Sequence, residues 1–140
     1  MAKKTFKDIV KFYDEAGILF DEFMAMHYSL FDSFWTPAAD LFVTDEAVCL
    51  MIEIAGVKKE DLTIFLAPTW IHVRGLKESP KTYDQGVNFY KLEIPYGFFQ
   101  KRVALPYRIE PKSLKINLKD GLLTLRMRRK EKGVEIIKVE

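Results

Sequence analysis

The sequence has little of the residue types that most often carry catalysis or bind metal. Its 140 residues include one cysteine and two histidines. The single cysteine, Cys49, excludes an intramolecular disulfide, and we predict a cytoplasmic protein because that compartment keeps thiols reduced. Cys49 lies in the apolar run 47–52 and is interpreted as a packed sheet residue. His27 and His72 lie far apart, with no cysteine or carboxylate at ligand spacing, so we expect no metal site.

Glycine is also scarce, and its pattern excludes a common class of cofactor site. None of the seven glycines forms the G-x-x-x-x-G-K or G-x-G-x-x-G pattern that cradles phosphates. We therefore expect neither a nucleotide nor another cofactor. Glu53, Glu93 and Asp120 stand singly in predicted strands or turns, which favours structural roles over acid–base catalysis. The sequence predicts a protein that is not an enzyme.

No charge of one sign dominates, and no long apolar run is present. Lys and Arg number 22 and Asp and Glu number 20, which leaves a net charge of +2. This balance does not favour a nucleic-acid partner, and the basic cluster within 126–132 is interpreted as a solvated strand end. No apolar run approaches the roughly 18 residues of a membrane-spanning helix. Neither nucleic acid nor a membrane is an expected partner.

Aromatic residues are abundant instead, at 14% of the chain, and nine of them lie within residues 1–35. Between residues 6 and 34 the apolar side chains recur at helical spacing, with acidic and lysine residues on the other face. Thr5 and Asp8 have the pattern of a helix N-cap, and Gly17 is expected to bend or split the segment. We predict an amphipathic helical N-terminal arm.

From residue 39 the hydrophobic period changes from 3.6 to 2, which is typical of an all-β sandwich. Val48, Leu50 and Ile52 share one face of a predicted strand, and Asp120-Gly121 predicts a tight hairpin turn. The gap 75–88 is interpreted as a loop. The predicted strands are 39–44, 47–54, 61–66, 70–74, 88–93, 99–105, 113–118 and 122–128.

The β region resembles the small heat-shock protein family, whose core is the alpha-crystallin domain. The resemblance covers residue 35 to the C-terminus and is carried by six motifs in order. They are Trp35-x-Pro37-Ala38-x-Asp40, Glu53-Ile54-Ala55-Gly56-Val57-Lys58-Lys59-Glu60-Asp61-Leu62, Ile71-x-Val73-x-Gly75, Tyr96-Gly97-x-Phe99-x-Lys101, Leu105-Pro106, and Asp120-Gly121-Leu122-Leu123-Thr124-Leu125. The resemblance implies an immunoglobulin-like β-sandwich over residues 35–129, flanked by an arm (1–34) and a C-terminal extension (130–140).

Four positions depart from the family pattern. Ala55 stands where proline is usual, Leu76 where glutamate is frequent, and Lys101 where arginine is frequent. Ile116 replaces a usual alanine and adds bulk on a strand that the resemblance assigns to docking of the C-terminal extension.

The resemblance implies an ATP-independent chaperone that holds partly unfolded client proteins and prevents their aggregation. It implies a homo-oligomer built from dimers, in which the 88–93 strand pairs beside the 39–44 strand of a second subunit. The expected dimer-interface residues are Leu41, Phe42, Val43, Phe89, Tyr90 and Leu92. An edge strand covered in this way is protected from aggregation.

The resemblance also implies that the C-terminal extension links dimers by docking an apolar motif in a groove. Two motifs are present, formed by Val134 with Ile136 and by Ile137 with Val139, and the second is slightly favoured because it is nearer the end of the sequence. The expected groove residues are Ile64, Leu66, Leu114 and Ile116.

The arm is the expected client-binding segment, since flexible methionine and flat aromatic side chains suit partners of no fixed shape. The candidate residues are Phe6, Phe12, Phe20, Phe23, Met24, Met26, Phe31 and Phe34. The alternative is that the arm only forms the core of the oligomer.

Two other classes of protein remain open. One is a β-sandwich co-chaperone or adaptor that binds one defined protein partner. Such proteins usually lack an aromatic arm and a tail motif. The other is a membrane-surface protein that uses residues 6–34 as an in-plane helix. Residues 1–34 carry four lysines against six acidic residues, which disfavours anionic lipid.

Overall fold

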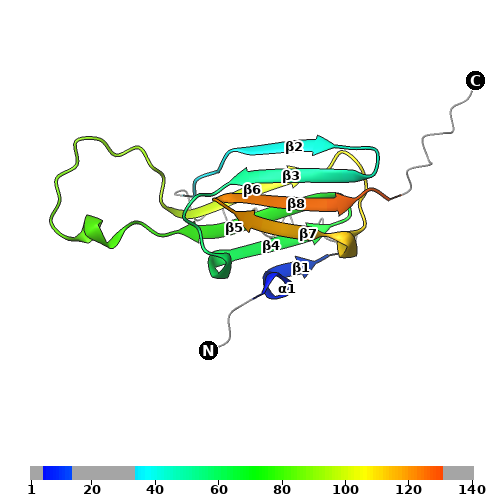
Figure 1. The fold of residues 1–140 in the computed structure, drawn as a ribbon, viewed down its shortest axis with the longest axis horizontal. Coiled ribbons are helices and arrows are strands. Elements are labelled where there is room, and N and C mark those ends of the chain that lie inside the picture. Colours follow the sequence, from blue (N-terminus) through cyan, green and yellow to red (C-terminus); the bar gives the residue numbers. More distant parts are fainter. Residues whose placement is uncertain (1–4, 14–33, 131–140) are drawn as a thin grey trace, which may run out of the picture.

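Two four-stranded sheets pack face to face in the computed structural model, which describes residues 5–13 and 34–130 (Figure 1). One sheet has the order β1 (Val10–Phe12), β4 (Leu62–Ala67), β5 (Trp70–Lys77) and β6 (Gly97–Ala104). The other has the order β2 (Ala39–Val43), β3 (Ala47–Glu53), β8 (Leu122–Arg128) and β7 (Lys115–Lys119). The predicted all-β sandwich is confirmed.

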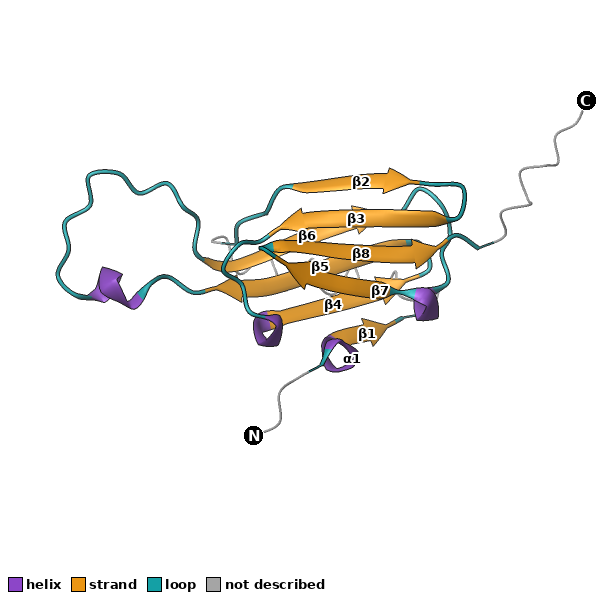
Figure 2. Cartoon of the chain, viewed as in Figure 1, coloured by secondary structure: helices purple, strands orange, loops and turns teal. Residues whose placement is uncertain are grey.

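Helical structure in the described residues is confined to one turn before β1 and to short turns between later strands (Figure 2). These are α1 (Phe6–Ile9) and the 3-10 turns Lys59–Asp61, Lys81–Asp84 and Pro111–Ser113. Thr5 and Asp8 form the capping box at the start of α1, as their spacing predicts.

The core is formed by the inward faces of both sheets. The inward faces of β3 and β8 bury Val48, Leu50 and Ile52 opposite Met127, Leu125 and Leu123, all of them fully enclosed. The hairpin between β7 and β8 turns at Asp120 and Gly121, whose φ angles are +54° and +80°. Positive φ at both positions is the geometry of a two-residue hairpin turn, and it explains the Asp-Gly pair.

The N-terminal arm corrects the helix predicted over residues 6–34. After one turn of α1 the chain becomes the strand β1, which pairs in parallel with β4. Val10, Lys11 and Phe12 alternate as a strand does, but the apolar residues around them recur at helical spacing, so the pattern predicts a helix. Backbone hydrogen bonds to the edge of β4 stabilise residues 10–12 as a strand rather than as a continuation of the helix. The rest of the predicted helix, 14–33, lies outside the described residues.

A second correction concerns residues 88–93, which form no strand. They belong to a long loop, 78–96, which projects beyond the end of the sandwich between β5 and β6 (Figure 1). A strand needs a neighbour to pair with, and the projecting loop brings none alongside this segment within the described chain. Smaller differences are that β5 extends to Lys77 and that β6 begins at Gly97.

Candidate interaction surfaces

The edge strand β2 is the first exposed apolar surface. Within the described residues it pairs only with β3, and the register places Phe42 opposite Cys49. Leu41, Phe42 and Val43 are 40%, 45% and 41% exposed. An edge strand with apolar side chains is a template for pairing with another chain.

The 78–96 loop is the second exposed apolar surface. Phe89, Leu92 and the fully exposed Tyr90 lie along it. The Tyr83 ring contacts the rings of Phe89 and Tyr96 edge to face, with centroids 4.9 and 5.6 Å apart. The loop is therefore braced by its own aromatic residues, while much of its apolar surface faces solvent. All six residues expected at the dimer interface lie on these two surfaces and are exposed.

The third surface lies where β1 joins β4. Val10 pairs with Ile64 and Phe12 with Leu66, and the Tyr13 amide donates to the Leu66 carbonyl at 2.8 Å. Ile9 is only 2% exposed and belongs to the core.

Aromatic and cationic side chains fasten this segment at both ends. The Tyr13 ring lies 6.0 Å from those of Phe65 and Trp70, measured between centroids. The Lys59 Nζ lies 5.3 Å from the centroid of the Phe6 ring. Together with the hydrogen bonds to β4, these contacts hold residues 6–13 on the sandwich.

A pocket of about 510 Å³ opens between β1 and β7, the edge strands of the two sheets on this side. It is lined by Phe6, Val10, Phe12, Lys112, Leu114 and Ile116. Only part of the expected groove is therefore open, because Ile64 and Leu66 are fully buried. The sequence analysis did not predict that β1 lines this pocket. The alternation of apolar and polar residues at 10–12 would have indicated a strand there.

Other predicted residues are distributed as follows. Phe34 stacks on Phe98 with centroids 5.7 Å apart, at the edge of β6. The client-binding candidates outside the described residues are Phe20, Phe23, Met24, Met26 and Phe31. The tail residues Val134, Ile136, Ile137 and Val139 also lie outside them.

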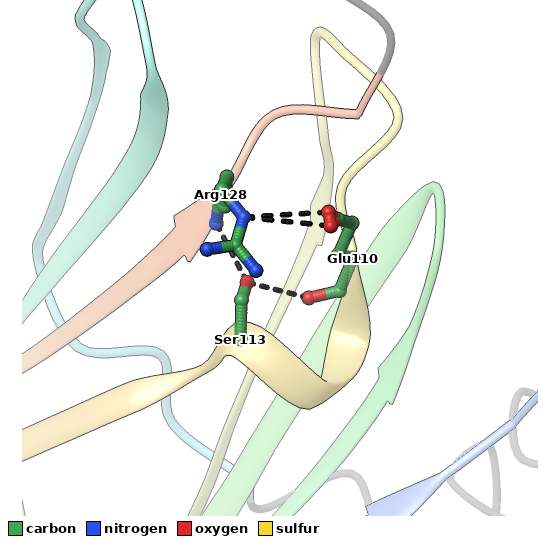
Figure 3. Close-up of polar contacts among 3 residues, drawn as sticks. All are labelled: Glu110, Ser113 and Arg128. Carbon is green, nitrogen blue, oxygen red and sulfur yellow. Dashed lines mark hydrogen bonds and ion pairs between the residues drawn. The ribbon is translucent and has the colours of Figure 1, made fainter.

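A polar clasp joins the start of β7 to the end of β8 (Figure 3). The Ser113 hydroxyl donates to the Glu110 carbonyl at 2.6 Å and accepts from the Arg128 amide at 2.8 Å. The Arg128 guanidinium lies 3.3 Å from the Glu110 carboxylate. The clasp continues the pairing of the two strands beyond the last ladder position, Lys115 with Arg126.

Arg108, Lys112 and Lys130 line a second cavity, of about 840 Å³, next to the clasp. This cavity shares Phe12 and Lys112 with the pocket between β1 and β7. Glu110 also lines the second cavity, so three cationic side chains and one carboxylate lie beside the shared end.

The described residues contain neither a cluster of three metal-ligating side chains nor a helix that is long and apolar enough to cross a membrane. What they present is an all-β sandwich with exposed apolar edges. An exposed apolar edge of this kind can pair with another chain.

Comparison with known proteins identifies the family. The Hsp20/alpha crystallin family matches residues 40–140. The small heat shock protein C2 of Rickettsia felis is 28% identical over 120 residues, covering 82% of this chain and 77% of that protein. The spore protein SP21 of Stigmatella aurantiaca is 29% identical over 91 residues, which are 65% of this chain and 53% of that protein.

Solved structures share the fold. Heat shock protein 16.0 of Schizosaccharomyces pombe has a TM-score of 0.63 at 24% identity, covering 69% of this chain and 89% of that one. HspA of Xanthomonas axonopodis has a TM-score of 0.61 at 21% identity, covering 69% and 95%. The chain belongs to the Hsp20/alpha crystallin family of small heat shock proteins, and the family implies a chaperone role.

Proposed function

We propose that the protein is an ATP-independent holding chaperone, which binds partly unfolded proteins and prevents their aggregation. The observation that carries this proposal is the exposed apolar surface of a family member. Phe12, Phe98 and Tyr90 are each at least half exposed on an otherwise well-packed sandwich. Exposed patches of this kind mark surfaces that bind other chains.

The client-binding part of the proposal is tested in the full-length protein with suppression of aggregation of a heated client. Removing all of residues 1–34 would be a poor test, because it would also remove β1 and uncover Ile64 and Leu66. The variant therefore carries serine only at the five candidates that lie between β1 and the sandwich in the sequence. These are Phe20, Phe23, Met24, Met26 and Phe31. We expect the suppression to fall several-fold.

The matched control changes acidic residues of the same segment, with serine at Asp14, Glu15, Asp21 and Glu22. It should retain the suppression, because it removes no apolar contact. Full suppression by the apolar variant would refute client binding through this segment and would leave it as oligomer core.

We also propose a dimer in which residues 88–93 pair with β2 of a second copy. The two surfaces are complementary, since an unpaired apolar edge would receive an apolar segment that has no strand partner among the described residues. Burying Phe89, Tyr90 and Leu92 would contribute roughly 1.5–3 kcal/mol each before ordering costs.

The dimer is tested by native mass. A Tyr90→Ser and Leu92→Ser double variant should shift the smallest stable species from dimer to monomer. Lys91→Gln, in the same segment, is the control and should leave the dimer unchanged. A dimer that persists in the double variant would contradict the pairing.

We propose in addition that the tail residues Val134, Ile136, Ile137 and Val139 link dimers into larger assemblies. Two buried aliphatic side chains contribute roughly 3–5 kcal/mol before ordering costs, so each link is weak. Many weak links acting together hold an assembly and still allow subunits to exchange. A variant that ends at Lys130 should lose the large assemblies by light scattering. An unchanged mass would count against the tail.

A further inference from the structure

The base of the 78–96 loop is closed by a cationic side chain that contacts two aromatic rings. Lys77 ends β5 and pairs with Gly97, the first residue of β6, at the last position of that ladder. The Lys77 Nζ lies 5.5 Å from the centroid of the Tyr96 ring and 5.9 Å from that of the Trp35 ring. Both distances are within the range in which a cation is attracted to a ring face. The two ends of the loop are therefore joined one residue beyond the last strand pair.

The Lys77 ammonium has no ion-pair partner among the residues that the structure describes. Glu78, the next residue in the sequence, lies 3.5 Å from the Lys58 Nζ instead. A Cβ placed on Gly56 would lie 3.9 Å from the Lys77 Cε, so the stem of the lysine lies against the turn that follows β3. The half-buried side chain is thus contacted at its stem by backbone and at its charged end by rings.

Trp35 holds the same base from the side of the sandwich. Its indole N–H donates to the Gly97 carbonyl at 3.2 Å, and its amide donates to the Phe98 carbonyl at 3.1 Å. Its ring packs on the buried Phe99 ring, with centroids 5.2 Å apart. Gly97 has a φ angle of +100°, a conformation that favours glycine and turns the chain from the loop into β6. Trp35 therefore contacts both this turn and Lys77.

Ring contacts continue this support outward along the loop, as far as a residue of the expected dimer interface. The Tyr96 ring contacts that of Tyr83, which in turn contacts Phe89. Tyr83 belongs to the 3-10 turn Lys81–Asp84, so its backbone is locally ordered. Phe89 is 46% exposed at the outer end of this row of rings. The contacts thus connect the sandwich to the segment 88–93.

We infer that Lys77 is the positioning residue of the proposed dimer, because its ammonium group, shared by the Trp35 and Tyr96 rings, sets the direction in which the 78–96 loop leaves the sandwich. The inference rests on the proposed pairing of residues 88–93 with β2 of a second copy. A free loop loses conformational freedom when it pairs, whereas a braced loop has lost part of that freedom beforehand. Bracing therefore strengthens the dimer without adding a contact between the two copies.

The inference is tested in the full-length protein with Lys77→Met, which keeps an unbranched stem and removes the charge. Two cation–π contacts are lost in each copy, so the concentration at which the smallest stable species changes from dimer to monomer should rise about tenfold in native mass. The amides of residues 88–93 should also exchange hydrogen about threefold faster or more. Lys77→Arg keeps a cation beside both rings and should restore both values.

Lys81→Met is the matched control, because Lys81 is an exposed lysine of the same loop and contacts no aromatic ring within the described part of the chain. It should leave the dimer and the exchange rates unchanged. Tyr96→Leu tests whether Lys77 acts through the ring. In that background Lys77→Met should weaken the dimer much less than it weakens the wild type, since the two residues share one contact.

Three results would overturn the inference and leave the pairing with β2 standing. They are a dimer that Lys77→Met leaves unchanged, a failure of Lys77→Arg to restore it, and an undiminished effect of Lys77→Met in the Tyr96→Leu background. A wild-type protein whose smallest species is a monomer at every concentration, with residues 88–93 exchanging as an unpaired segment, would instead refute the proposed dimer itself.

Discussion

Burial of His72 should make the free energy of unfolding depend on pH, by an amount set by the shift of its pKa. His72 lies on β5, where the register places it between Phe65 of β4 and Arg102 of β6, and it is 1% exposed. Burial, then the charges of Arg102 and Arg74, lowers its pKa from 6.5 to about 4, although a hydrogen bond with Gln100 acts in the opposite direction. The folded protein therefore resists protonation of this ring.

The lowered pKa of His72 makes the folded protein less stable as the pH falls. Between pH 6.5 and pH 4 the unfolded chain protonates His72 and the folded chain does not, so the unfolded state gains stability as the pH falls. The contribution is complete above pH 6.5 and is lost progressively toward pH 4. One pKa unit corresponds to about 1.4 kcal/mol, so the free energy of unfolding should drop by about 2 kcal/mol at pH 5 and about 3 kcal/mol below pH 4.

The assay is urea unfolding of the wild-type protein and His72→Gln at pH 7.5 and pH 5. All samples have one protein concentration, because assembly adds to apparent stability. Carboxylates titrate in both proteins, so the informative quantity is the difference between the two pH dependences. We expect the wild type to lose about 2 kcal/mol more than the variant. Equal losses would show that the protonated ring is accommodated in the fold, and the reasoning from burial would fail.

Two further predictions concern the packing and the clasp. Gly75→Ala would place a Cβ 2.7 Å from the Asp61 carbonyl oxygen and from the buried Phe99 ring. It should cost about 1–3 kcal/mol in thermal or urea unfolding, and a neutral result would show that Phe99 can move. Ser113→Ala leaves the Arg128 amide without its hydroxyl acceptor and should cost about 1 kcal/mol. Faster hydrogen exchange at that amide checks this result, and unchanged exchange would contradict the role of the clasp.

The strands that the sequence predicts well are those whose partners belong to the same chain. β8 alternates cleanly because one of its faces packs on the core, β3 is a nearly continuous apolar run between two paired strands, and Asp120-Gly121 marks the hairpin turn from β7 to β8. The hydrophobic pattern of such strands reflects which of their faces are buried within the same chain. Their predicted limits therefore differ from the observed ones by only a residue or so.

The predictions that the structure corrects concern segments whose conformation depends on a strand distant in the sequence. Residues 10–12 have apolar neighbours at helical spacing, and only the exposed edge of β4 makes them a strand. Residues 88–93 have strand composition but project from the sandwich without a strand beside them. The open part of the predicted groove could not be foreseen for the same reason, since β1 pairs beside Ile64 and Leu66. Local pattern carries no information about a distant edge.

The two anchors of the arm limit what the residues between them can do. β1 lies on the β4 edge of one sheet, and Trp35 is hydrogen-bonded to Phe98 and Gln100 of β6, at the opposite edge of the same sheet. Tyr13 and Trp35 are therefore held at opposite edges of one sheet. Fixing both ends of a chain segment removes part of its conformational freedom in advance, so less freedom remains to be lost on binding a partner. Under the proposed chaperone function, a client bound between the two anchors would lie beside the sandwich and close to its exposed apolar surfaces.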